Sequence, residues 1–297
     1  EDEDGNFFSY DPSIERTHQV QKALFHEKQT LIENCLFAVD INPNSVKICR
    51  LRLWIELLKN AYYNKDQVLQ TLPNIDINIK CGNSLISRFG LEDDLKTAFK
   101  SKENPYSLRD YKNAVKEYKQ TNDKARKKEV QTIIDTIKGA FKDSLDKKFI
   151  NKIAKARGRY IAKKEQFNTR FGAKKTKKDK AELKRLKTAL DKLEAQKEET
   201  LNNVIYQDAF EWRFEFPEVL DDKGAYLGFD VVIGNPPYVQ LQKLGEIATH
   251  YSKIGYKTYA RTGDLYALFY ELGNNVLKTK GLLCFITGSA WLRSNYG

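Results

Sequence analysis

The chain has 297 residues, of which 31% are charged and 41% are hydrophobic, and its formal net charge is +11 at pH 7. This length suggests one or two domains with a substantial buried core. No apolar run reaches the roughly 18 residues needed to span a bilayer, and no signal peptide is visible, so the composition argues against a membrane or secreted protein and predicts a cytoplasmic one.

The four cysteines predict no cross-links. Cys35, Cys49, Cys81 and Cys284 lie far apart inside apolar segments, without a CxxC pair, and the chain has only three histidines. Buried free thiols are therefore expected, rather than a disulfide framework or a zinc site. No metal site is predicted.

The N-terminal third predicts helices and short strands. A helix is expected from Ser13 to about Ile32, and the apolar segment 36–40, which ends in Asp40, is expected to be a strand. Asn42 as N-cap and Pro43 at the first helical position then start a helix that runs to about residue 60. Residues 75–80 alternate apolar and polar side chains, which predicts a strand that ends at the sequence CGNSL.

Residues 91–205 are rich in lysine, nearly free of proline and glycine, and helical in their spacing. Leu183, Leu186, Leu190 and Leu193 follow the 3,4,3 spacing of a heptad seam, which predicts a helical hairpin. Residues 101–200 hold 30 Lys and Arg against 15 Asp and Glu, whereas the rest of the chain holds 21 and 25. Two interpretations stay open: a solvated helical face, or a surface that attracts a phosphate backbone.

The segment FDVVIGNPPYV, residues 229–239, predicts a buried strand that ends in a rigid loop. Pro236 and Pro237 fix φ and lack an N–H, so backbone carbonyls are left beside the amide of Asn235 and the ring of Tyr238. Such a loop is suited to accept both protons of an NH₂ group while the ring stacks on a heterocycle. The alternative is a tight turn without a chemical role.

Further elements flank this segment. The aromatic residues 210–219 are expected to pack the helical insertion against the core. After Tyr238, an N-capped helix is predicted from Thr262 to Leu277, followed by a buried strand over 281–287.

FDVVIGNPPYV resembles motif IV of the S-adenosylmethionine-dependent amino-methyltransferases, specifically those that methylate adenine N6 in DNA. Relatives that methylate cytosine N4 usually carry Ser in place of Asn235. Protein-glutamine methyltransferases also carry NPPY, so the motif by itself implies an amine or amide nitrogen as acceptor. The resemblance implies that Asn235, Pro236, Pro237 and Tyr238 form the catalytic loop.

Other segments resemble further motifs of this family. The strand that ends in Asp40 resembles motif II, whose acid binds the ribose of the cofactor, although Asp40 is alternatively an ordinary acid near a helix N-terminus. Asn83 stands where motif III usually has Asp, and it retains an acceptor oxygen without the charge. The sequence DLYALF resembles motif V and implies that Asp264, Leu265 and Tyr266 line the cofactor pocket, unless it is only an amphipathic helix. Residues 281–287 resemble motif VI.

Together these motifs imply an α/β fold, a Rossmann-like methyltransferase sheet interrupted by a long Lys-rich helical insertion. The expected parts are residues 1–90 and 206–297 for the core and 91–205 for the insertion. The implied function is methylation of adenine N6 in double-stranded DNA by S-adenosylmethionine, with an endonuclease elsewhere in a fused restriction-modification enzyme. The alternatives are a nucleic-acid-binding fragment without activity and a protein-glutamine methyltransferase.

The resemblance also implies segments that this sequence lacks. Motif I, a glycine-rich loop after the central strand, would precede residue 1, and a target-recognition domain would follow Gly297. The chain begins with Glu1 and contains no methionine. We therefore expect it to be a piece of a longer polypeptide, with a gap between the Asp40 strand and the NPPY strand, and to be inert by itself.

Overall fold

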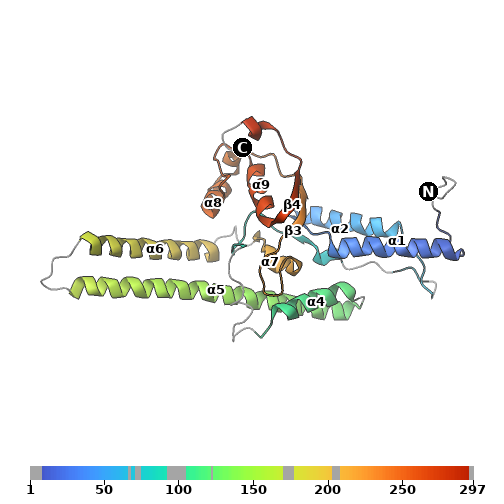
Figure 1. Cartoon of the computed structure of the whole chain (residues 1–297), viewed down its shortest axis with the longest axis horizontal. Coiled ribbons are helices and arrows are strands. Elements are labelled where there is room, and N and C mark those ends of the chain that lie inside the picture. Colours follow the sequence, from blue (N-terminus) through green and yellow to red (C-terminus); the bar gives the residue numbers. More distant parts are fainter. Residues whose placement is uncertain are drawn as a thin grey trace. The chain divides into compact units, whose positions relative to one another are not determined.

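The computed structural model, shown in Figure 1, describes residues 9–65, 68–70, 75–91, 105–121, 123–169, 177–202 and 208–293. It is a mixed α/β structure that divides into two compact units. Unit 1 comprises Glu1–Ser84, Arg109–Asp135 and Phe216–Glu218, and unit 2 comprises Leu85–Leu108, Thr136–Glu215 and Val219–Gly297. Each unit contains one two-stranded parallel sheet. No helix in the described ranges is long and apolar enough to cross a membrane.

Unit 1 is built on helices α1 (Glu15–Asn34) and α2 (Pro43–Leu58) and strands β1 (Ala38–Asp40) and β2 (Ile79–Cys81). Strand β1 runs parallel to β2, with Asp40 opposite Cys81. The predicted start of α2 is confirmed, because the side chain of Asn42 accepts a hydrogen bond from the backbone N–H of Asn44 at 2.9 Å. The small core between the helices contains the buried side chains of Phe25, Ile32, Leu57 and Tyr62.

The predicted strand over 75–80 is wrong in its first half. Residues Ile75–Ile77 form a 3-10 turn, and only Ile79–Cys81 pair as a strand. One of the polar residues that suggested alternation does not face solvent: Asn78 is buried, and its amide donates to the carbonyl oxygens of Ile32 and Glu33 at 3.2 and 2.6 Å. These tertiary hydrogen bonds override the period-two pattern.

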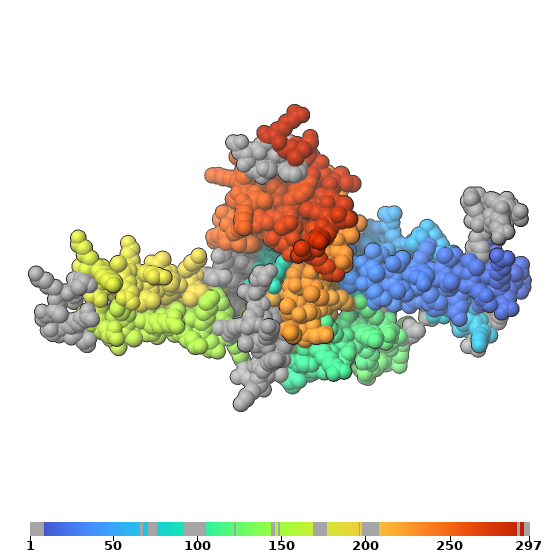
Figure 2. All heavy atoms as spheres, viewed as in Figure 1, coloured from blue at the N-terminus to red at the C-terminus, as the bar shows by residue number. Residues whose placement is uncertain are grey.

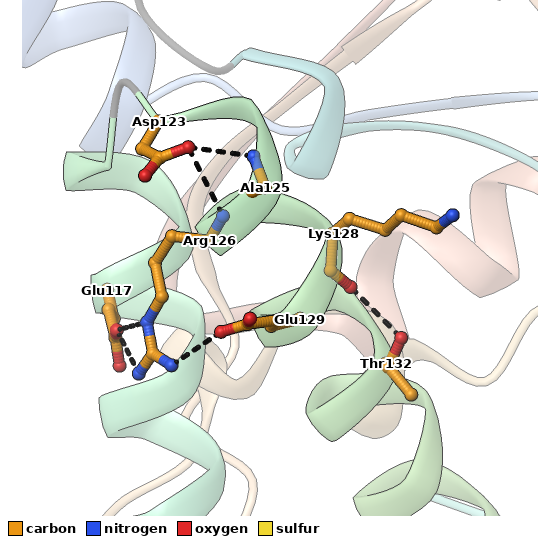
Figure 3. A network of polar contacts seen from close by, with 7 residues as sticks. All are labelled: Glu117, Asp123, Ala125, Arg126, Lys128, Glu129 and Thr132. Carbon is orange, nitrogen blue, oxygen red and sulfur yellow. Dashed lines mark hydrogen bonds and ion pairs between the residues drawn. The ribbon is translucent and has the colours of Figure 1, made fainter.

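Helix α4 (Leu108–Gln120) turns sharply into α5 (Lys124–Thr169). Figure 3 shows the polar network at this corner: the Arg126 guanidinium reaches Glu117 and Glu129 at 2.7 and 3.0 Å. Asp123 caps α5, because its Oδ1 accepts the backbone N–H of Ala125 at 2.8 Å. The corner is therefore held by side chains from both helices.

Within unit 2, α5 and α6 (Lys177–Asn202) lie side by side and antiparallel, as Figures 1 and 2 show. The predicted leucine seam faces the partner helix, since Leu190 is buried and Leu183, Leu186 and Leu193 are half-buried. Ion pairs cross the hairpin between Arg157 and Glu194 at 2.5 Å and between Lys163 and Glu182 at 2.7 Å. The predicted helical hairpin is thus present. The two compact units divide the segment 91–205 between them.

The rest of unit 2 contains α7 (Trp212–Glu215), α8 (Glu246–Ile254), α9 (Leu265–Val276) and strands β3 (Phe229–Gly234) and β4 (Leu277–Phe285). The aromatic connector packs as expected: Phe210 and Phe214 are buried, and the Phe214 ring lies 6.3 Å from that of Phe141 on α5. A salt bridge of 2.7 Å between Lys138 and Glu215 joins the same two helices.

Strands β3 and β4 are present, but the prediction that they are buried is wrong. Ile233 is 76% exposed and Leu282 is 64% exposed. Side chains alternate between the two faces of a strand, and α9 covers only the face that carries Leu283 and Phe285. The opposite face, with Val231, Ile233, Leu282 and Cys284, is therefore open in the described part of unit 2.

The cysteines are free, as expected, but they are not buried. Cys35, Cys81 and Cys284 are exposed, and Cys49 is half-buried. Cys284 faces away from α9, Cys35 directly follows the last residue of α1, and Cys81 is the last residue of β2. The apolar neighbours in the sequence were therefore a poor guide to burial.

Candidate active site

The NPPY loop begins where β3 ends. Strand β3 pairs in parallel with β4, with Gly234 opposite Phe285, and the Gly234 carbonyl accepts a further hydrogen bond from the N–H of Ile286 at 3.1 Å. In the loop itself Pro236 is buried, whereas Asn235, Pro237 and Tyr238 are exposed. The buried proline anchors the loop, and the amide that the sequence predicts to accept an NH₂ group is open to solvent.

Tyr238 is fixed at both ends of its side chain. Its hydroxyl donates to the carbonyl oxygen of Ile286 at 2.9 Å, and its ring meets the ring of Tyr266 edge to face, with 6.0 Å between centroids. Gly288 lies beside the same ring, where even an added Cβ would stand 3.9 Å away. The ring is still 54% exposed. An aromatic ring held in place yet half open is a suitable platform for stacking a base.

The start of α9 continues this site. The N–H of Leu265 donates to the carbonyl oxygen of Val239 at 2.8 Å. The N–H of Leu241 donates to the carbonyl oxygen of Gly263 at 2.9 Å. Asp264 occupies the N-cap position of α9 and is half-buried, and Leu265 and Tyr266 are buried. The segment that resembles motif V is therefore hydrogen-bonded directly to the end of the NPPY loop.

Residues after β4 complete the site, although none of them was predicted to be a site residue. The hydroxyls of Tyr270 on α9 and Thr287 lie 2.8 Å apart, and the Tyr270 ring packs against Phe285. Gly273 lets α9 approach β4 closely, since a Cβ there would stand 2.7 Å from Cδ1 of Leu283. Residues 281–287 were predicted as a strand that resembles motif VI, but β4 ends at Phe285. Ile286 and Thr287 therefore lie in the loop after the strand, where parallel sheets carry sites.

Asp40 and Asn83 lie at the ends of the neighbouring strands of unit 1. Oδ1 of Asp40 accepts the N–H of Asn42 at 2.7 Å, and its carbonyl oxygen accepts the N–H of Gly82 at 3.0 Å. Asp40 is exposed, and Oδ2 accepts no hydrogen bond from the described residues. Asn83, half-buried, follows β2 by two residues. The two candidate cofactor acceptors are therefore brought to the same edge of the β1–β2 sheet.

The half-buried carboxylate of Glu211 anchors the segment that follows Asn83. Glu211 accepts hydrogen bonds from the Ser87 hydroxyl at 2.6 Å and from the Arg88 N–H at 2.7 Å. Burial raises the pKa of Glu211, and these hydrogen bonds offset part of that effect. The carboxylate oxygens of Glu211 are thus used to hold residues 87 and 88 in place, which indicates a structural role for Glu211 rather than a catalytic one.

The predicted site residues thus fall into two groups. Unit 1 holds Asp40 and Asn83, and unit 2 holds the NPPY loop and the start of α9. Each group is assembled at the carboxyl ends of two parallel strands. Within the described residues, no group of three or more His, Cys, Asp or Glu side chains is placed to hold a metal ion.

Comparison with known proteins identifies a family. The model of the Eco57I restriction-modification methylases matches residues 34–297. A putative type II restriction enzyme and methyltransferase from Methanocaldococcus jannaschii, RM.MjaORFECS2P, is 25% identical over 308 residues, which cover 90% of this chain and 23% of that protein. The type II methyltransferase M.XhoI from Xanthomonas vasicola is 38% identical over 69 residues, 23% of this chain and 13% of that protein.

A third relative is the type II methyltransferase M.PaeR7I from Pseudomonas aeruginosa, which is 33% identical over 69 residues, 23% of this chain and 12% of that protein. The chain therefore spans less than a quarter of the length of these curated relatives. No solved structure matches it.

Proposed function

The chain belongs to the Eco57I restriction-modification methylase family, and we propose that it is the part of a DNA methyltransferase that methylates adenine N6 in double-stranded DNA. The observation that carries this proposal is the NPPY loop. Its amide is exposed, its tyrosine ring is held half open, and it is hydrogen-bonded to the segments that follow β4 and precede α9.

The chemistry follows from the residue types in the loop. Asn235 Oδ1 and the Pro236 carbonyl accept the two protons of an adenine amino group, which orients its nitrogen lone pair toward the methyl donor. The same two oxygens stabilise the positive charge that develops on nitrogen during the attack. Tyr238 stacks on the adenine after it leaves the duplex and compensates part of the lost base stacking. The choice of adenine rather than cytosine rests on Asn rather than Ser at position 235.

The implied cofactor is S-adenosylmethionine, which supplies an electrophilic methyl group on a sulfonium. The exposed carboxylate of Asp40 fits a pair of ribose hydroxyls, because Oδ2 is open to a donor. Asn83 offers an amide oxygen for the adenine amino group. In unit 2, the resemblance to motif V assigns Asp264, Leu265 and Tyr266 to the cofactor. The donor set contains acceptors and apolar surface, which suits a nucleoside, and it contains no metal-ligand cluster in the described ranges.

The whole enzyme is larger than this chain in our proposal. The parallel strand pairs β1–β2 and β3–β4, each with candidate residues at its carboxyl ends, support a Rossmann-like sheet formed by residues 1–90 and 206–297, with the Lys-rich helices of 91–205 inserted. Further segments of the same polypeptide would supply a glycine-rich cofactor loop and a target-recognition domain. We also propose that the whole enzyme carries an endonuclease and is located in the cytoplasm. Residues 1–297 alone are then inert.

The nature of the acceptor separates this proposal from its rivals. A polypeptide that carries the chain and a glycine-rich cofactor segment is incubated with S-adenosylmethionine labelled in the methyl group and with duplex DNA. We expect label in N6-methyladenine after nuclease digestion. Label in protein and none in the nucleosides would identify a protein-glutamine methyltransferase. DNA binding without label in either would identify an interaction fragment.

The isolated chain gives a second test. Calorimetric titration of residues 1–297 with S-adenosylmethionine should show weak or undetectable binding, because the methionine end lacks its loop and such positioning supplies several kcal/mol. Tight binding by residues 1–297 alone would show that the cofactor site is misplaced in this proposal.

A further inference from the structure

The end of the hairpin formed by α5 and α6 carries a charge equal to that of the whole chain. Residues 155–187 hold 14 Lys and Arg and 3 Asp and Glu, a surplus of 11. The rest of the chain holds 37 of each sign. The positive field of this protein therefore originates in one segment of 33 residues, and that segment lies outside the candidate active site.

Two of the three acids in this segment pair with a lysine across the hairpin. Glu182 and Asp179 on α6 lie 2.7 and 4.0 Å from Lys163, whose side chain is half-buried between the helices. Together with the leucine seam, these contacts align the two helices. The two helices of the hairpin are thus joined by apolar contacts and ion pairs, and exposed lysines and arginines remain on their outer surface.

Four exposed lysines follow one another along one side of α6. They follow the spacing 3,4,3, which places them on one side of the helix over about 15 Å. All four are exposed, and none forms an ion pair with a residue in the described part of the chain. We call this set the lysine row: Lys177, Lys180, Lys184 and Lys187. Lys178 and Arg185 lie next to it and are also exposed.

Like charges three and four residues apart destabilise a helix. Because the lysine row keeps four exposed like charges three and four residues apart, its arrangement favours an external polyanion with regularly spaced charges. The partner that fits best is a nucleic-acid backbone, whose phosphates repeat at a few ångströms along the axis.

We propose that the lysine row on α6 binds the phosphate backbone of duplex DNA, away from the methylated base and without sequence preference. This inference rests on the proposed function only for the identity of the partner, because the row itself is defined by its charges. Its role is to hold and align the DNA substrate, whereas recognition of the target base belongs to the NPPY loop.

The test compares two fourfold variants of the 297-residue chain with equal charge change. In the first, every member of the lysine row is replaced by Gln. In the control, four exposed helical lysines of unit 1 without a described ion pair are replaced by Gln: Lys22, Lys47, Lys116 and Lys128. Binding to a fluorescent 30-base-pair duplex is measured by anisotropy over a series of salt concentrations, and circular dichroism verifies that both variants retain their helices.

Loss of four phosphate contacts should lower the slope of log affinity against log salt by about 3 to 4, because each contact contributes about 0.9. We expect at least a tenfold loss of affinity at low salt for the lysine-row variant and less than a threefold loss for the control. Equal losses in both variants would overturn the proposal, because net charge alone would then explain binding. An unchanged slope in the lysine-row variant would overturn it as well.

Two further measurements keep this inference distinct from the proposed function. The lysine-row substitutions in the longer methylating polypeptide should raise the KM for DNA and leave kcat within about twofold. If that polypeptide methylates no DNA while the row still binds duplex, only the proposed function fails. Vesicles of phosphatidylserine are a competing polyanion: if they bind the chain through the row and duplex DNA does not, the proposed partner is wrong.

Discussion

The two parallel strand pairs of this chain have the same topology and are stabilised in different ways. In unit 1, polar side chains hold β2 in place: the guanidinium of Arg50 donates to the carbonyl oxygens of Asp76 and Ile79, and the amide of Asn78 donates to the end of α1. In unit 2, glycines let backbones approach closely. A Cβ at Gly228 would stand 2.8 Å from the backbone of Leu277.

The same difference is seen in the candidate site residues of the two units. Asp40 is positioned by its own turn, through the N–H of Asn42, and remains exposed as a charged acceptor. Tyr238 is instead fixed by Ile286 and Tyr266, which come from two other segments. Asp40 is thus positioned by atoms close in the sequence, whereas the position of Tyr238 depends on contacts with distant segments.

The largest effect is expected at Asn235. In the longer methylating polypeptide, Asn235→Ala removes an oxygen that stabilises charge only as the amine attacks, so kcat should fall by about 10² to 10³. The affinity for S-adenosylmethionine, measured by calorimetry, should change less than twofold. As a control, Gln242→Ala removes an exposed amide just beyond the loop and should leave kcat unchanged. A loss of cofactor affinity that parallels the loss of kcat would contradict the assigned role.

The opposite pattern is expected at Asp40. Asp40→Ala removes a charged acceptor for the ribose hydroxyls, a hydrogen bond worth about 1.5 to 3 kcal/mol, so cofactor affinity should fall by about 10- to 100-fold. At saturating cofactor, kcat should remain within about threefold of the original value. Asp40→Asn keeps one acceptor oxygen, so its cofactor affinity should lie between that of Asp40→Ala and that of the original chain. If Asp40 is only an acid near the start of α2, neither substitution will change cofactor affinity.

Much of unit 2 was predictable because its signals are local. The 3,4,3 leucine spacing predicted that α6 packs against a partner helix, and the proline pair marked the end of β3. The hydrogen bond from Tyr238 to Ile286 spans 48 residues and has no local signature. Composition also cannot show that α9 covers only one face of the β3–β4 sheet, so the exposure of Ile233 was missed.

In unit 1 the errors have the same origin. Residues 75–80 alternate like a strand, but the buried amide of Asn78 and the contact of Arg50 with the carbonyl oxygens of Asp76 and Ile79 require a 3-10 turn before β2. These partners are 26 to 46 residues away in the sequence. In contrast, the cap at Asn42 uses atoms two residues apart, and it was predicted correctly.

The contribution of the close backbone approach at Gly228 should appear in the free energy of unfolding. Gly228 has φ of +86° and a backbone neighbour at 2.8 Å, whereas Gly255 has φ of +92° and nothing within 4 Å of an added Cβ. Gly228→Ala should therefore lower the free energy of unfolding by about 2 to 3 kcal/mol, from strain and steric overlap together. Gly255→Ala should lower it by about 1 kcal/mol, from strain alone. Urea denaturation followed by circular dichroism measures both, and equal losses would show that the close approach of β3 to β4 is not stabilising.

The smallest effect tests the polar side of the comparison. Glu56 on α2 accepts hydrogen bonds from Lys28 on α1 and Lys59, at 2.7 and 2.6 Å, and these bonds lower its pKa from 4.5 to about 2. Because the folded-state pKa lies below the unfolded one, the contribution of Glu56 to stability is present above pH 4.5 and is lost as the pH falls toward 2. The group is exposed, so the contribution is small and weakens with added salt.

We expect Glu56→Gln to unfold at a slightly lower temperature than the original chain at pH 6 and at the same temperature near pH 2. Glu27→Gln, on the exposed side of α1 and without an ion pair in the described ranges, should match the original chain at both values. A difference between Glu56→Gln and the original chain that persists unchanged near pH 2 would show that Glu56 acts through packing and not through its charge.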